Sequence, residues 1–357
     1  MHNGSHTQVL VLGLGPAGAS AATEAARRGC RVVALERKHE AGHPVQCAEF
    51  VPAMLGMDVP DLAASVRQNI RAMMTFVEAA PPDVQEQFPG RMLDRAAFDA
   101  ALVDDAIRAG AQCRFDAVVR RVTSTGTVEL ANGETFSADV VIGADGPRSH
   151  AGAAIGQPNT ELVHTRQITV PLSRPYDATD IFLSADIPGG YGWLFPKGEV
   201  ANLGAGVTPR YRARLKQIVA SLHETLVQRG RVGRDVLGLT GGLIPVGGMK
   251  QCSSALARTL VLLAGDAGGL TNPVTGAGIA AAVYSGRLAG QAAAAWIGGN
   301  RSAGAEYQDE LETLFKPALD RAVRRRTELA AALAGGALPR ERVLRRGWIA
   351  YPEYWAA

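Results

Sequence analysis

Cysteine is scarce in this sequence, and its spacing is unlike that of metal ligands. Four cysteines occur in 357 residues, and no two of them form a CxxC pair. This pattern argues against a structural zinc site and against a disulfide framework, and it fits a reducing compartment. We therefore expect a cytoplasmic protein without a bound metal. The four cysteines are Cys30, Cys47, Cys113 and Cys252.

Long apolar runs are also missing. Residues 1–7 have neither the charged region nor the apolar segment of a signal peptide, so we expect no secretion. The longest alanine-rich stretch, residues 276–299, is interrupted by Arg287 and Gln291. These polar residues favour a buried or partly buried helix of a soluble protein over a membrane span.

The chain has little net charge, but that charge is unevenly distributed. Thirty-seven Lys and Arg against 34 Asp and Glu give +3, which is too even a balance for nucleic-acid binding through the overall field. From residue 313 onward, nine basic residues outnumber four acidic ones. The same tail holds a cluster of aromatic residues at its end, namely Trp348, Tyr351, Tyr354 and Trp355.

Two interpretations of this basic and aromatic tail are open. It suits peripheral contact with an anionic membrane surface, or with a protein partner. The alternative is a solvated helix whose aromatic end docks on the body of the protein. The sequence alone does not decide between them.

The apolar patterns predict an α/β fold. Residues 8–13 form a continuous apolar run typical of a buried parallel strand. A helix-forming stretch and a second apolar run follow, up to residue 36, which predicts a βαβ unit. Further buried strands are expected at 139–143 and 259–264, and a further helix at 95–110. Residues 38–90 show no clear period.

The texture of the sequence changes between residues 160 and 250. β-Branched runs alternate there with Gly- and Pro-rich turns, which predicts a mostly antiparallel sheet inserted into the first domain. A helical pattern from about residue 306 is broken at 333–339. The expected division is a Rossmann-like nucleotide-binding domain at 1–75, 91–155 and 255–305, a substrate domain at 76–90 and 156–254, and a helical tail at 306–357.

A GxGxxG motif connects the first predicted strand to the first predicted helix. Gly13 would permit the tight turn, Gly15 would let the backbone approach a pyrophosphate, and Gly18 would let the helix pack on the sheet. Glu36 ends the next strand, where it would accept a hydrogen bond from a ribose hydroxyl. The motif predicts a dinucleotide site without separating NAD from FAD. We also assign to this site Pro16, Ala17 and Arg37.

Two later motifs separate these cofactors. Asp145 and Asp266 each follow a predicted parallel strand, at the sheet edge where ligands of open α/β sheets bind. Asp266 would accept from a ribityl hydroxyl, and the helix beginning near residue 278 would direct its positive end at a flavin ring. The ordered set of motifs resembles the FAD-binding fold of the p-hydroxybenzoate hydroxylase group. The residues assigned here are Asp145, Gly146, Gly265, Asp266, Gly276, Ala277, Gly278 and Ile279.

Over roughly residues 7–300 the sequence resembles the geranylgeranyl reductase family. PVQCAEF at 44–50 lies where that family has Pro-x-x-Cys-Gly, and 91–99 match its Arg-x-x-Phe-Asp element. GYGWLFPK at 190–197 matches its Tyr-x-Trp-x-Phe-Pro motif. The resemblance implies an FAD-dependent oxidoreductase that reduces carbon–carbon double bonds of a prenyl or other apolar substrate by hydride transfer from FADH2.

The loop around Cys47 carries the first group of candidate site residues. Cys47 is expected beside the flavin as a modulator or proton relay, or else as an inert small side chain. Ala48 stands where many family members have glycine, and Glu49 is a candidate proton donor. Arg95 would contact a phosphate or ribose of FAD. Its alternative role is an ion pair with Asp94 or Asp99.

Three aromatic residues form the second group. Tyr191, Trp193 and Phe195 alternate, so on a strand they share one face. That face would make an apolar wall for a hydrocarbon chain beside the flavin, or it would pack in the core of the inserted sheet. Cys47, Glu49, Tyr191 and Trp193 are the catalytic candidates.

Other functions of the same fold stay open. One is a flavin-dependent monooxygenase, or a maturation enzyme, acting on a small aromatic molecule or a protein side chain. Another is a flavin-bearing binding or assembly protein. No second GxGxxG follows a predicted strand, so we expect NAD(P)H to bind transiently, or the donor to be ferredoxin or a quinol.

Overall fold

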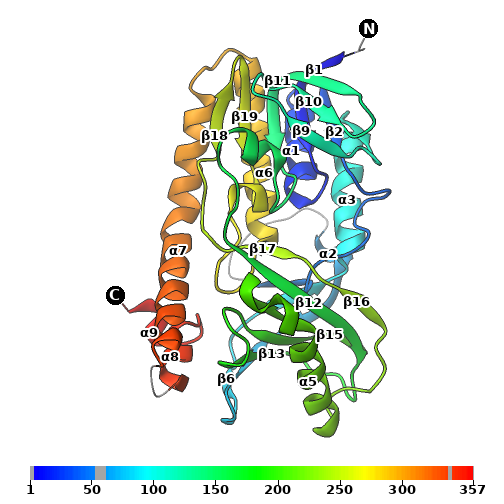
Figure 1. Cartoon of the computed structure of the whole chain (residues 1–357). Coiled ribbons are helices and arrows are strands. Elements are labelled where there is room, and N and C mark those ends of the chain that lie inside the picture. The colour runs from blue at the N-terminus through cyan, green and yellow to red at the C-terminus, as the bar shows by residue number, and fades with distance from the viewer. Residues whose placement is uncertain (1–3, 53–61, 337–339, 357) are drawn as a thin grey trace.

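The apolar run near residue 8 is the centre of a parallel sheet (Figure 1). The computed structural model describes residues 4–52, 62–336 and 340–356. The strands of this first sheet are β1 (Gly4–Leu12), β2 (Val32–Leu35), β8 (Gln112–Arg114), β9 (Val119–Val122), β10 (Val128–Leu130), β11 (Thr135–Gly143), β18 (Ser253–Leu256) and β19 (Thr259–Leu263). Their order is β18-β19-β11-β1-β2-β8, and β9 and β10 extend from β11. The predicted α/β fold class is confirmed.

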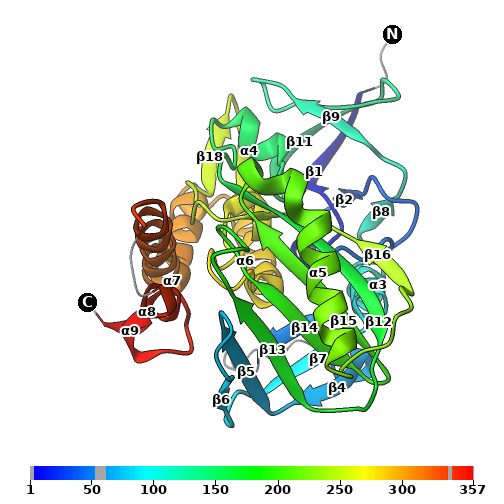
Figure 2. The ribbon, with the colours of Figure 1, turned by 60° about the horizontal axis from the view of Figure 1, so that its bottom comes forward.

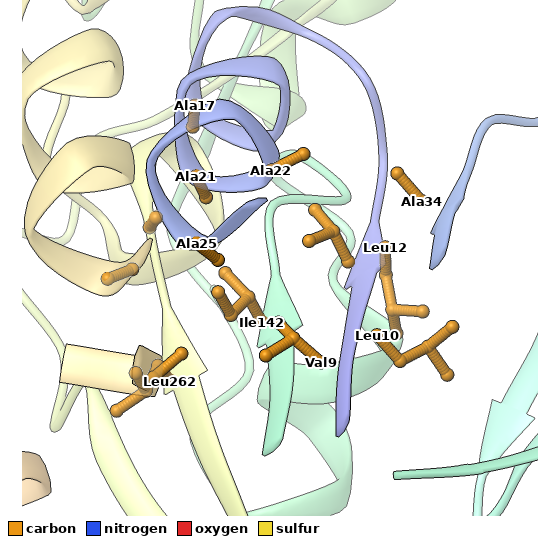
Figure 3. Packing of buried hydrophobic residues seen from close by; sticks show 14 of the residues in the cluster. Val9, Leu10, Leu12, Ala17, Ala21, Ala22, Ala25, Ala34, Ile142 and Leu262 are labelled. Carbon is orange, nitrogen blue, oxygen red and sulfur yellow. The ribbon is translucent and has the colours of Figure 1, made fainter. Parts of the chain in front are cut away.

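Helices pack on this sheet, and the helices at residues 16–27 and 279–297 pack closely because small residues, mainly alanine and glycine, make up most of their buried faces. The helices on the sheet are α1 (Pro16–Arg27), α3 (Arg95–Arg108), α4 (His150–Ala154) and α6 (Ile279–Ile297). Figure 3 shows the alanines of α1 facing the apolar side chains of β1, β11 and β19. A Cβ on Gly286 of α6 would lie 2.1 Å from the Ala17 carbonyl oxygen, so α6 and α1 meet backbone to backbone.

A second, mostly antiparallel sheet lies below the first in Figure 1. Its strands are β5 (Ala72–Val77), β6 (Asp83–Gln85), β12 (Leu162–Pro171), β13 (Ala178–Leu183), β14 (Gly192–Lys197), β15 (Val200–Val207), β16 (Gly238–Thr240) and β17 (Leu243–Pro245). The order is β16-β12-β15-β14-β13-β5-β6, and β17 pairs with β12. The helix α5 (Leu215–Gln228) lies across one face (Figure 2). The opposite face is left for the cavity described below.

Residues 38–90, where the sequence showed no clear period, form short elements. Strands β3 (Phe50–Pro52), β4 (Val66–Ile70) and β7 (Gly90–Leu93) make a small sheet in the order β3-β7-β4. The short helix α2 (Leu62–Ser65) precedes β4. Strand β5 begins at Ala72 and pairs in parallel with β13. The second sheet therefore takes in residues from 72 onward, a little before the boundary expected at 76.

The tail folds back along the molecule. Helix α7 (Ala303–Ala334) runs beside both sheets and brings α8 (Arg340–Arg346) next to β5 and β6 (Figures 1 and 2). Helix α9 (Pro352–Trp355) follows and packs against α8. Trp348 is 3% exposed and Trp355 is 52% exposed. Tyr351 and Tyr354 are buried as well. Three of the four tail aromatics are therefore docked on the body of the protein, as one of the two interpretations of the tail expected, and only Trp355 among these four is exposed. Part of the predicted helix break, residues 337–339, lies outside the described residues.

Two further findings concern the described residues. None of the helices placed by the structure is both long and apolar enough to cross a bilayer. Within the same described ranges, no cluster of three or more His, Cys, Asp or Glu side chains is arranged to hold a metal ion.

Candidate active site

A cavity of about 370 Å³ lies between the first sheet and the open face of the second. It brings together the glycine-rich turn before α1, the Cys47 loop, the start of α6 and strand β14. The C-terminal segment also reaches it through Arg326, Trp348 and Ile349. The predicted residues on its walls are Gly15, Pro16, Ala17, Cys47, Ala48, Glu49, Arg95, Gly146, Tyr191, Trp193, Phe195, Asp266, Gly276, Ala277, Gly278 and Ile279.

The three glycines of the glycine-rich turn have different structural roles. Gly13 has a φ of +92°, and a Cβ there would lie 2.4 Å from the Ala144 carbonyl oxygen. A Cβ on Gly18 would lie 1.8 Å from the Gly13 carbonyl oxygen. A Cβ on Gly15 would meet nothing within 4 Å, because Gly15 faces the cavity. Gly13 and Gly18 are therefore required by packing, whereas Gly15 leaves space for a ligand.

The N-terminus of α1 is suited to a phosphate. Gly15 is its N-cap and Pro16 its first residue, and no side chain caps it. The N–H groups of the first turn, with the positive end of the helix dipole, are left for an anion. Glu36 supports this turn, since its carboxylate accepts from the Leu14 N–H at 2.8 Å and the Lys38 N–H at 3.0 Å.

Other predicted cofactor residues lie behind the cavity wall or beside it. Five of them are not on the cavity surface but lie next to lining residues in the chain or in space: Gly13, Gly18, Glu36, Asp145 and Gly265. Arg37 is exposed. The Asp145 carboxylate accepts from Ser149 Oγ and from the His150 N–H, which holds the start of α4. Burial raises the pKa of Asp145, and the hydrogen bonds to its carboxylate partly offset this rise.

Asp266 faces the cavity directly. Its carboxylate accepts from Thr271 Oγ1, and burial raises its pKa, partly offset by Thr271 and by the charge of Arg95. A Cβ on Gly278 would lie 2.4 Å from Thr271 Oγ1. The loop after β19 thus packs closely against the start of α6.

The Cys47 loop is held by hydrogen bonds that the sequence did not indicate. The Gln167 side chain donates to the Cys47 carbonyl at 3.1 Å and accepts from Trp193 Nε1 at 3.1 Å. Asn202 Nδ2 donates to the Ala48 carbonyl at 3.3 Å. Both side chains come from the neighbouring strands β12 and β15, and only the folded sheet brings them to this loop.

Glu49 anchors the same loop. It is 5% exposed and has a φ of +68°, a conformation that favours glycine. Its carboxylate lies 2.5 Å from Lys197 Nζ and 2.8 Å from Asn202 Nδ2. The backbone N–H of Arg95 donates to the other carboxylate oxygen of Glu49 at 3.2 Å. These contacts fix the position of the carboxylate, and a proton-donor role for Glu49 stays a prediction.

Arg95 forms the ion pair that the sequence left open. Its Nε and Nη2 donate to the two Asp99 carboxylate oxygens, each at 3.0 Å, across one turn of α3. It also lies beside Cys47 on the cavity wall. Contact with FAD remains a prediction for this residue.

An aromatic cluster forms the far wall of the cavity. Trp193 and Phe195 lie on β14 and Tyr191 directly precedes it, with successive ring centroids 5.7 and 6.3 Å apart. Trp348 from the tail lies 4.8 Å from Tyr191, and the Tyr191 hydroxyl donates to the Thr275 carbonyl at 2.6 Å. These rings both pack together and line the cavity. We define the aromatic cluster as Phe50, Phe88, Tyr191, Trp193, Phe195, Trp348 and Tyr351.

Replacing Lys197 by methionine is expected to lower the free energy of unfolding by about 2–3 kcal/mol, because it leaves a buried carboxylate without its cation. This loss is smaller than that for a fully buried pair, since Lys197 is 23% exposed. Chemical denaturation followed by circular dichroism measures this change. Lys316→Met is the matched control, as it breaks an exposed pair with Asp320 and should cost less than about 1 kcal/mol. Equal losses in both variants would contradict the anchoring role.

Comparisons with known proteins agree with this geometry. A family model described as an FAD binding domain matches residues 6–177, and one described as the geranylgeranyl reductase catalytic domain matches residues 163–243. Digeranylgeranylglycerophospholipid reductase 1 of Methanopyrus kandleri is 35% identical over 332 residues, covering 86% of each chain. The chain belongs to the geranylgeranyl reductase family. A Methanothrix thermoacetophila relative named digeranylgeranylglycerophospholipid reductase is 34% identical, covering 80% of this chain and 77% of the relative.

A solved structure supports the same assignment. The geranylgeranyl bacteriochlorophyll reductase-like protein of Thermoplasma acidophilum superposes with a TM-score of 0.80 and is 25% identical, covering 98% of each chain. The protein is thus an FAD-dependent oxidoreductase of this family. The residues fit the cofactor, because Gly15 opens the turn to the cavity and the uncapped start of α1 faces the same space. Gly146, Asp266 and Gly278 would hold its other parts.

Proposed function

We propose that this protein reduces carbon–carbon double bonds in the prenyl chain of a lipid. The observation that carries this proposal is the single cavity bordered by the glycine-rich turn and α6 on one side and by the aromatic cluster on the other. Such a wall suits a long hydrocarbon, which makes apolar contacts along its length. Relatives named digeranylgeranylglycerophospholipid reductases give independent support.

The chain's own residues position the substrate and exclude water. Trp193 and Phe195 are buried on the cavity wall, and Tyr191 is tied by its hydroxyl to the loop before α6. The chemistry that FAD supplies when bound and reduced is hydride transfer to one carbon of the double bond. The wall holds the chain against the cofactor side of the cavity and keeps bulk water from it.

The second carbon of the double bond requires a proton. Cys47 is the side chain on this wall that we propose for the relay, since it lines the cavity together with Tyr191 and interacts with the Arg95 side chain. Burial raises the pKa of Tyr191 above its ordinary value, so the phenol stays protonated. The hydroxyl therefore serves as a fixed donor to the Thr275 carbonyl, which orients the ring.

The electron donor and the place of the reaction are proposed as well. We propose NAD(P)H or ferredoxin as the source of electrons. We also propose peripheral contact with an anionic membrane, or with a protein partner, through the part of the tail left exposed by docking. Trp355 is half exposed there, with the Arg321 guanidinium 5.2 Å from its ring, and Arg324 is exposed on the same helix as Arg321.

Anaerobic turnover tests the reductase proposal. Holoenzyme reduced with dithionite should be reoxidised by a geranylgeranyl glycerophospholipid in neutral detergent, and mass spectrometry should show two added hydrogens per reduced double bond. The fully saturated lipid is the matched control and should leave the flavin reduced. Reoxidation by oxygen alone, together with NAD(P)H-driven hydroxylation of a small aromatic substrate, would instead support the monooxygenase alternative.

A further inference from the structure

The cavity wall contains two arginine side chains that differ in their partners. Arg95 is neutralised by two hydrogen bonds to Asp99. Arg326 of α7 forms no ion pair within the described part of the chain, and the structure gives it a single 3.5 Å hydrogen bond from Nη1 to the Pro273 carbonyl. A guanidinium has five N–H donors. Most of the hydrogen-bonding capacity of Arg326 is therefore left for a ligand.

Arg326 lines the same cavity as the aromatic cluster. One helical turn earlier, Val323 packs 3.0 Å from the Cβ position of Gly248. One turn later, Leu329 packs against the apolar core that contains the aromatic cluster. Residues three positions apart share one face of a helix, so the Arg326 side chain leaves α7 between these two contacts and over the loop that holds Pro273.

The surroundings of Arg326 disfavour an unpaired charge. Burial lowers its pKa, and the nearby charge of Glu161 opposes this effect without an ion pair. Arginine nevertheless stays protonated in proteins, so this partly buried guanidinium on the cavity wall would be stabilised by an anionic partner. The preceding residue, Arg325, is buried and has partners for its guanidinium. It donates to two backbone carbonyls and to the Glu328 carboxylate.

We infer that Arg326 binds the phosphate group of a substrate whose prenyl chain extends along the aromatic cluster. This inference rests on the proposed function and adds to it the residue that would hold the phosphate ester at the head of the prenyl chain. A guanidinium matches two phosphate oxygens with two parallel N–H donors. Trp348 and Val274 border the same region, so the apolar part of the ligand begins next to the charge.

Binding to the oxidised holoenzyme tests this inference without catalysis. Geranylgeranyl monophosphate and geranylgeraniol share one chain and differ in the phosphate, and both are titrated in neutral detergent while the flavin spectrum and tryptophan fluorescence are recorded. Arg326→Gln should weaken binding of the phosphate by about 10- to 100-fold, the range expected for lost hydrogen bonds to a charged group. It should leave binding of the alcohol unchanged. Arg326→Lys should be intermediate.

Matched controls separate the outcomes. Lys316→Gln removes an exposed cation of the same helix and should change neither affinity. Millimolar inorganic phosphate should compete with the phosphorylated ligand and not with the alcohol. Equal weakening of both ligands by Arg326→Gln would overturn the inference, and so would loss of FAD from that variant. Failure of the wild-type protein to bind geranylgeraniol would instead overturn the proposed function, and the inference with it.

Discussion

Replacing Gly15 by valine is expected to abolish FAD binding while leaving the fold intact. A Cβ at this position meets no atom within 4 Å, so the added side chain has room in the protein alone. That room is the part of the cavity against the uncapped N-terminus of α1. A bulky side chain there keeps the pyrophosphate away from the backbone N–H groups of the turn.

The expected size of this effect follows from the hydrogen bonds that are lost. Each bond to a charged group contributes about 1.5–3 kcal/mol, and each 1.4 kcal/mol changes affinity about tenfold. Losing two such bonds should raise the Kd for FAD by about 100-fold or more, measured by flavin fluorescence on the apoprotein. Circular dichroism and the Tm of the apoprotein should match those of the wild type.

Two glycine variants make this result interpretable. Gly298→Ala places a methyl group at the end of α6, where the nearest atoms lie at 3.4 Å, and should leave FAD affinity unchanged. Gly18→Ala forces a Cβ to within 1.8 Å of the Gly13 carbonyl oxygen and should impair folding itself. If Gly15→Val retained wild-type affinity for FAD, the assignment of this turn to the pyrophosphate would be wrong.

The sequence predicted the parts of the fold whose signals are local. The apolar run of β1, the GxGxxG turn and the helix after it are contiguous, and each has its own pattern. Residues 38–90 gave no such signal because their strands are short and pair with distant segments. Strand β5 is an example, since its partner β13 lies about a hundred residues later.

The site follows the same rule. Gly15, Asp266 and Trp193 belong to local motifs, and all three line one cavity. Gln167 and Asn202 carry no motif, and they reach the Cys47 loop only because β12, β14 and β15 are neighbours. The tail was recognised as basic and aromatic. That Trp348 and Arg326 reach the cavity depends on the direction of α7, which composition does not encode.

Replacing Trp348 by alanine is expected to be the most damaging single change in the tail. Trp348 is 3% exposed and its ring packs at a tilt against that of Tyr191, and removal of a buried Trp side chain typically costs about 3–5 kcal/mol. The free energy of unfolding should fall by about that amount in chemical denaturation. In the reductase assay, KM for the prenyl lipid should rise, because the wall of the cavity next to α8 is lost.

Two further variants separate packing from hydrogen bonding and from general effects of the tail. Trp348 Nε1 has no hydrogen-bond partner among the described residues, so Trp348→Phe sacrifices no bond and should stay within about 1–2 kcal/mol of the wild type. Trp355→Ala alters an exposed ring of the same segment and should cost about 1 kcal/mol or less. If Trp348→Ala were as stable as Trp355→Ala, the tail would not be docked on the second sheet in solution. A docked tail, in contrast, makes the cavity wall and the stability of the second sheet depend on the same side chain.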